Sequence, residues 1–131
     1  MRVAELEGAL LDYWVAKADG KDPIIYGNED DDVRGHYVAL SSDTSRAYAP
    51  SSFWEQGGPI IERERIEVGP ADTDGWEAIV CQRMEHHPVL GIPTGIHLYK
   101  KGATPLIAAM RAFVASKFGD EVGDAQPKSA S

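Results

Sequence analysis

The stretch from Gly102 to Val122, GATPLIAAMRAFVASKFGDEV, spells one complete helix together with its start and stop signals. Thr104 is a typical N-cap residue, Pro105 suits the first helical position, and Gly119 is placed to end the helix. The larger apolar residues recur at spacings of three and four, which predicts a buried stripe. This stripe consists of Leu106, Ile107, Met110, Phe113, Val114 and Phe118.

A second helix is predicted near the other end of the chain, from about Glu7 to Ala18, with Gly20 as its stop. Its apolar residues again gather on one face, and we expect Trp14 to lie in the core. That face consists of Leu10, Leu11, Trp14, Val15 and Ala18.

The sequence between these helices predicts strands. Two hairpins are expected, one around the acidic tract Gly27 to Gly35 and one around the turn sequence GPADTDG. Two stretches, Ser41 to Ser52 and Gln82 to Gly95, lack periodicity or contain proline and glycine, and are expected to be irregular. The predicted strands are Ile24 to Tyr26, His36 to Leu40, Ile60 to Val68, Trp76 to Cys81 and Ile96 to Lys100.

This order of elements predicts an α+β fold in a single domain, residues 1–122, followed by a flexible polar tail, residues 123–131. We expect a mostly antiparallel sheet of about four to five strands, with the N- and C-terminal helices packed on one face. A parallel α/β fold is disfavoured because the chain has too few helices to cross over between successive strands.

Composition narrows the classes of partner. The 131 residues carry 21 acidic and 13 basic side chains, for a formal charge of −8, and the basic residues do not cluster, so no nucleic-acid partner is expected. The apolar runs are shorter than a membrane helix requires. Acidic residues and Lys17 interrupt the apolar N-terminus, and a single cysteine agrees with a reducing compartment, so we expect a cytoplasmic protein.

The segment SSFWEQGG, residues 51–58, offers groups that could bind a ligand. Trp54 could stack on it, Gln56 could form hydrogen bonds, and Gly57 and Gly58 would let the backbone approach closely. Ser52 also has capping-box spacing to Glu55, and Gly57 could end a single helical turn. The competing interpretation makes Trp54 a core anchor and the glycines turn residues.

The next stretch, PIIERERIEV, is predicted to be a strand with charged residues on both faces. Glu62 and Glu64 would share one face, where they could act as a carboxylate pair or bind a cation, with Arg63 on the other. The alternative is a solvated strand whose charges pair with neighbouring strands. The binding candidates are therefore Trp54, Gln56, Gly57, Gly58, Glu62, Arg63 and Glu64.

No cofactor, metal or catalytic residue is predicted. The set Cys81, His86 and His87, with His36 and His97 elsewhere, matches no zinc spacing, and Cys81 is expected to be a small buried thiol. A calcium loop starting at Asn28, Asp30 and Asp32 fails because Val33 takes the glycine position and Ala39 the closing glutamate position.

Two long motifs, YAPSSFWEQGGPIIERE and GATPLIAAMRAFVASKFGDEV, together resemble the NinX family of small phage and prophage proteins. The opening AELEGALLDYWVAKADG is similar to that family as well. The resemblance implies a protein encoded by a tailed phage or prophage and made in the bacterial cytoplasm. It carries over no catalytic residue.

Three functions are compatible with these observations. The first is a non-enzymatic accessory protein that binds a host or phage protein, or self-associates, through the surface around Trp54 to Glu64. The second is a small-molecule-binding protein or hydrolase with a pocket around Trp54, Gln56 and Glu62. The third is an acidic mimic of DNA, which would need its acidic groups spaced along one face.

Overall fold

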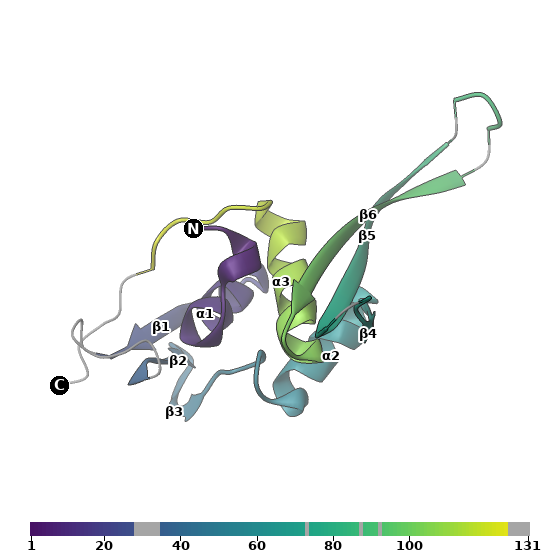
Figure 1. Ribbon diagram of the computed structural model, residues 1–131. Coiled ribbons are helices and arrows are strands. Elements are labelled where there is room, and N and C mark those ends of the chain that lie inside the picture. Colours follow the sequence, from purple (N-terminus) through teal and green to yellow (C-terminus); the bar gives the residue numbers. More distant parts are fainter. Residues whose placement is uncertain (28–34, 73, 87, 92, 126–131) are drawn as a thin grey trace.

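The computed structural model describes residues 1–27, 35–72, 74–86, 88–91 and 93–125. Within these residues the chain forms a 3-10 helix, three α-helices and six strands (Figure 1). The helices are η1 (Val3–Glu5), α1 (Gly8–Ala18), α2 (Trp54–Glu64) and α3 (Pro105–Phe118). The strands are β1 (Pro23–Tyr26), β2 (Tyr37–Leu40), β3 (Asp43–Ala47), β4 (Glu67–Pro70), β5 (Trp76–His86) and β6 (Pro93–Gly102).

The α+β class and the antiparallel pairing are confirmed, but the strands form two sheets. The first has the order β1-β2-β3 and the second the order β4-β5-β6. Helix α1 packs on β1 and β2, α3 packs on β4, β5 and β6, and the two helices pack on each other. Each terminal helix therefore covers a different sheet, and the core lies where α1 and α3 meet between them (Figure 1).

Helix α3 begins and ends where its sequence signals predict. The Thr104 side chain accepts a hydrogen bond from the Ile107 amide, and Gly119 is the C-cap residue with φ +85°. Burial is wider than the predicted stripe because alanines on the other faces are also enclosed, whereas Phe118 stays 44% exposed and packs edge-on against Trp14. The buried residues of α3 are Leu106, Ala108, Ala109, Met110, Ala112, Phe113, Val114 and Ala115. Small alanines let elements approach a central helix on several sides.

The start of the chain is fastened to the segment that follows α3. The Val122 amide donates to the Met1 carbonyl oxygen at 2.9 Å, and the Val3 amide donates to the Asp120 carbonyl oxygen at the same distance. Arg2 and Glu121 form an antiparallel bridge. Val3 and Val122 are both buried, so this contact seals one end of the core.

The strand predicted from Ile60 to Val68 is wrong. The chain continues from Trp54 to Glu64 as helix α2, and only Glu67–Pro70 of the following segment is a strand. Gly57 and Ile60, three residues apart, are the buried positions of α2, and the helix packs on α3. The predicted capping box and single turn are also wrong, because Phe53 is the N-cap residue, no side chain caps it, and Gly57 lies inside the helix.

Two segments expected to be irregular contain strands. Within Ser41 to Ser52, β3 pairs with β2, but every residue of β3 is exposed, so no apolar alternation marks it in the sequence. Within Gln82 to Gly95, β5 continues to His86 and β6 begins at Pro93. These strand ends pair antiparallel and project from the body as a two-stranded arm (Figure 1).

The remaining elements match the sequence predictions. Strands β1 and β2 form the first hairpin, β4 and β5 pair across the turn sequence GPADTDG, and α1 follows its predicted boundaries. Trp14 is partly buried and packs against the core. The middle of the acidic tract, residues 28–34, and the tail beyond Ala125 lie outside the described residues. None of the helices in the described part of the chain has the length and apolarity needed to cross a membrane.

Candidate functional site

Gln56, predicted as a ligand-binding amide, is instead bound to the protein's own backbone. Its Oε1 atom accepts a hydrogen bond from the Ala49 amide at 2.6 Å, and its Nε2 atom donates to the Ala47 carbonyl oxygen at 3.0 Å. The side chain thus ties the first turn of α2 to the end of β3. Both polar ends of this amide have a structural use.

The two glycines of α2 have different surroundings. A Cβ atom added to Gly57 would clash with the Pro50 carbonyl oxygen and would lie 2.7 Å from the Leu106 side chain. A Cβ atom added to Gly58 would meet nothing within 4 Å. Gly57 is therefore required for close packing of α2 on the preceding turn, whereas Gly58 faces open space.

A buried carboxylate on α1 holds the turn that leads into α2. Asp12 is 4% exposed, and its Oδ1 atom accepts a hydrogen bond from the Ser51 amide at 2.9 Å. Burial raises the pKa of Asp12 to about 6, although hydrogen bonds from the Ser51 side chain and backbone act in the opposite direction. Together with Gln56 and Gly57, this contact makes the segment from Ala47 to Gly57 a fixed part of the fold.

The same segment leaves two adjacent aromatic side chains in solvent. Phe53 is 47% exposed and Trp54 is 57% exposed, at the N-terminal end of α2. The interpretation of Trp54 as a core anchor is therefore wrong. Beside them, Arg46 on β3 forms an ion pair with Glu55 at 3.1 Å. We call Phe53 and Trp54 the aromatic pair.

Glu62, Arg63 and Glu64 do not form the predicted strand faces. On a helix, residues two positions apart point in different directions, so Glu62 and Glu64 do not act as a pair. Glu62 is exposed, while Glu64 interacts with Arg63 at 3.3 Å and with Lys117 at 3.4 Å. Arg63 also bonds Asp19 at 2.7 Å. These charges link the ends of three helices across the surface.

The cysteine and histidine residues give no metal site in the described part of the chain. There, no three His, Cys, Asp or Glu side chains gather closely enough to hold an ion. His87 lies outside the described residues. Cys81 is exposed, so the expected buried thiol is wrong. Cys81 lies in β5 next to a register shift in the pairing with β6.

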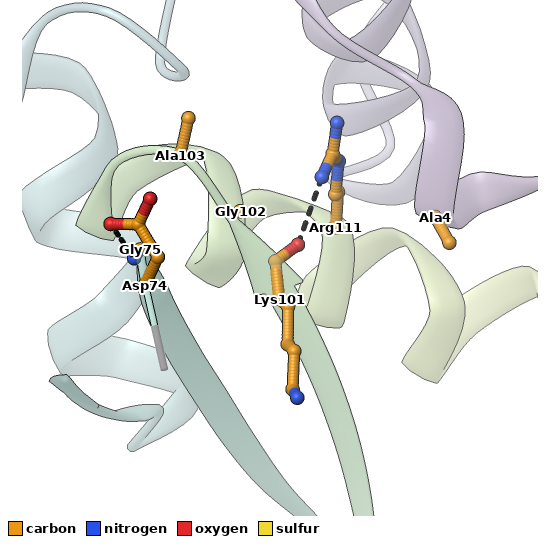
Figure 2. Close-up of a pocket in the computed structure, with 7 residues that line it drawn as sticks. All are labelled: Ala4, Asp74, Gly75, Lys101, Gly102, Ala103 and Arg111. Atoms are coloured by element: carbon orange, nitrogen blue, oxygen red, sulfur yellow. Dashed lines mark hydrogen bonds between the residues drawn. The ribbon is translucent and has the colours of Figure 1, made fainter. Parts of the chain in front are cut away.

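A pocket that the sequence did not indicate is lined by the segment before α3 and by Arg111 in the middle of that helix. It has a volume of about 420 Å³ and is formed where the end of β6, the turn before β5, η1 and α3 meet (Figure 2). Arg111 is its central polar group: Nε donates to the Leu6 carbonyl oxygen at 2.8 Å and Nη1 to the Lys101 carbonyl oxygen at 2.9 Å. The lining residues are Ala4, Asp74, Gly75, Lys101, Gly102, Ala103 and Arg111.

The floor of this pocket depends on a glycine. A Cβ atom added to Gly102 would lie 2.6 Å from the Ala108 amide nitrogen, so the end of β6 lies directly on the first turn of α3. This contact brings the Lys101 carbonyl within reach of Arg111 (Figure 2). Arginine occurs at other positions of this chain, and nothing in the pattern around Arg111 marks it as a site.

Comparison of this chain with known protein families gives a match over most of its length. The family model described as bacteriophage P22, NinX, matches residues 2–117. The chain belongs to the NinX family. The match spans all six strands, α1, α2 and nearly all of α3, and includes both the aromatic pair and the Arg111 pocket. A search of the curated proteins finds no match.

The structure gives a physical reading of the motif on which the resemblance to NinX rests. In YAPSSFWEQGG, residues 48–58, Ser51, Gln56 and Gly57 hold the backbone through hydrogen bonds or close packing. Phe53 and Trp54 are the large side chains that this arrangement presents to solvent. The motif therefore combines a rigid support with an exposed aromatic surface.

Proposed function

We propose that this protein is a phage- or prophage-encoded accessory protein that acts in the bacterial cytoplasm as a non-enzymatic interaction module. Membership of the NinX family supports the phage origin. The observation that carries the interaction proposal is the aromatic pair, two neighbouring large side chains about half exposed on a backbone that three contacts hold in place.

Physical chemistry favours this surface as a contact region. Tryptophan and other aromatic residues dominate the energetically important positions of protein interfaces because each buries a large area with few rotatable bonds. A rigid support lowers the entropic cost of binding. The Arg46–Glu55 ion pair lies beside the aromatic pair and would form part of a polar rim.

The alternative, a small-molecule pocket around Trp54, Gln56 and Glu62, has less support. Both ends of the Gln56 amide are used by backbone groups, and Glu62 lies two helical turns from Trp54. These three side chains do not converge on a common ligand. We therefore favour a protein as the partner, either a host or phage protein or a second copy of this chain.

The test compares two exposed aromatic sites. The Phe53→Ser/Trp54→Ser double variant and a Tyr99→Ser control, whose residue is 55% exposed on β6, are each used as bait in extracts of phage-infected cells. A partner recovered by the wild type and by the control is then purified, and its affinity is measured by titration calorimetry. We expect the double variant to bind it at least about tenfold more weakly.

Equal affinity of the wild type and the double variant would refute the aromatic pair as the contact surface. Light scattering on the purified chain separates self-association from binding of another protein. A dimer that the double variant abolishes identifies the second copy as the partner, whereas a monomer in both cases directs attention to a host or phage protein.

A further inference from the structure

The Arg111 pocket has features of a binding site that the proposed interaction function does not use. Arg111 projects from the middle of the central helix α3, and two backbone carbonyls on different elements fix its guanidinium group (Figure 2). A side chain held in this way loses little further freedom when it binds a ligand.

Within the part of the chain that the structure describes, the charge of Arg111 has no direct acidic partner. Among the described residues, no acidic side chain lies within ion-pair distance of Arg111, and its side-chain hydrogen bonds go to the neutral carbonyl oxygens of Leu6 and Lys101. Partial burial lowers its pKa, and the nearby negative charge of Glu7 offsets this effect only in part. A partly buried cation bound only by neutral groups is stabilised when an anion approaches it.

The surrounding charges limit the kind of anion. Figure 2 shows Asp74 on the other side of Gly102, while the side chain of Lys101 extends away from the Arg111 guanidinium. Glu7 is near enough to Arg111 for its negative charge to act on the pKa of that side chain. A doubly charged phosphate would be repelled by both carboxylates more strongly than a singly charged carboxylate. The planar guanidinium also matches the two oxygen atoms of a carboxylate.

We propose that the Arg111 pocket binds the carboxylate group of a small ligand. The volume of about 420 Å³ accommodates a small organic acid, and Ala4, Ala103 and the two glycines form walls without bulky side chains. The pocket is lined by the segment before α3 and by Arg111 in the middle of that helix, and the proposal does not depend on the aromatic pair.

The test is a titration of the full-length, ¹⁵N-labelled chain with acetate and with N-acetylglycine, followed by amide chemical shifts. Sodium phosphate forms a third arm, and sodium chloride at matched ionic strength is the baseline. We expect saturable shifts of the Ala4, Gly75 and Ala103 amides with the two carboxylates and weaker binding of phosphate. Shifts that do not saturate, or that equal those in chloride, would overturn the proposal.

Variants distinguish binding of the carboxylate in the Arg111 pocket from general electrostatic attraction to the protein. Arg111→Gln should weaken carboxylate binding at least about tenfold. Ala103→Trp, which fills the pocket from an exposed position and leaves Arg111 in place, should do the same if Arg111→Gln does not fold. Arg46→Gln, a control on β3, should bind as the wild type does. Unchanged affinity in the Ala103→Trp variant, or phosphate binding tighter than acetate binding, would contradict the assignment.

Discussion

Asp12 allows a quantitative test of how the segment before α2 is held. Asp12 is 4% exposed, and burial raises the pKa of its carboxyl group from the ordinary value of 3.8 to about 6. A raised pKa means that the folded state binds the proton more tightly than the unfolded state does. Asp12 therefore contributes most to stability below the unfolded pKa, and this contribution is lost as the pH rises from about 4 through about 6.

The perturbation is Asp12→Asn, which keeps an oxygen acceptor for the Ser51 amide and removes the charge. The difference in the free energy of unfolding between variant and wild type isolates Asp12 from the other titrating groups. A shift from 3.8 to about 6 changes that difference by about 2 kcal/mol between about pH 4 and pH 7.5, in favour of the variant at the higher pH.

Urea denaturation at several pH values across this range, followed by tryptophan fluorescence, measures the difference directly. Asp12→Ala serves as a second variant because it also leaves the Ser51 amide without its acceptor, so it should be less stable than Asp12→Asn at every pH. A difference between Asp12→Asn and wild type that stays constant with pH, or that moves in favour of the wild type as pH rises, would refute the reasoning.

Substitutions at four further positions test the packing of α2 and the capping of α3. Gly57→Ala should destabilise the protein by about 1–3 kcal/mol because its Cβ would meet the Pro50 carbonyl. Gly58→Ala, in open space on the same helix, should stabilise the protein by about 0.5–1 kcal/mol. Equal effects of the two substitutions in thermal denaturation would contradict this account. Gln56→Ala should lower the free energy of unfolding by about 1–3 kcal/mol because the Ala49 amide and the Ala47 carbonyl lose their hydrogen-bond partner. An unchanged melting temperature would show that these bonds do not hold the segment before α2 in place. Thr104→Ala should lower the free energy of unfolding by about 1 kcal/mol, whereas Thr104→Ser should keep the N-cap hydrogen bond and the stability. A similar loss of stability in both variants would argue against capping as the cause.

The sequence predicted the fold best where a local signal and the tertiary structure agree. Thr104, Pro105 and Gly119 mark the ends of α3 because capping depends on a few neighbouring residues. The pairing of β1 with β2 is also a local feature, since these two strands are neighbours in the sequence. The division into two sheets was not predictable from such signals, because it depends on which sheet each helix covers.

The sequence predicts a strand where helix α2 forms, and this error has a physical reason. Two glycines and Pro59 within the segment are typical of turns, and the alternation of glutamate and arginine after Ile61 resembles a solvated strand. The packing of Gly57 and Ile60 against the turn and α3 overrides these local preferences. The strand prediction therefore places Glu62, Arg63 and Glu64 on the wrong faces, and it does not foresee that the side chain of Gln56 bonds to nearby backbone atoms.

The Arg111 pocket could not be predicted from the sequence for a different reason. It unites residues from η1, the turn before β5, the end of β6 and the middle of α3, which lie far apart in the sequence. No spacing rule connects them. Phe53 and Trp54, in contrast, are visible in the motif as two neighbouring aromatic residues. Their exposure to solvent could not be predicted from the sequence.

Site-specific photocrosslinking from the aromatic pair tests the central claim most directly. Trp54 is replaced by the photoreactive residue p-benzoylphenylalanine in phage-infected cells, with the same residue at Tyr99 as a control, since both positions are exposed. The account predicts a discrete crosslinked protein from position 54 that is absent from position 99. Crosslinks from position 54 that are no more frequent or discrete than those from position 99 would contradict the claim that the aromatic pair is the contact surface.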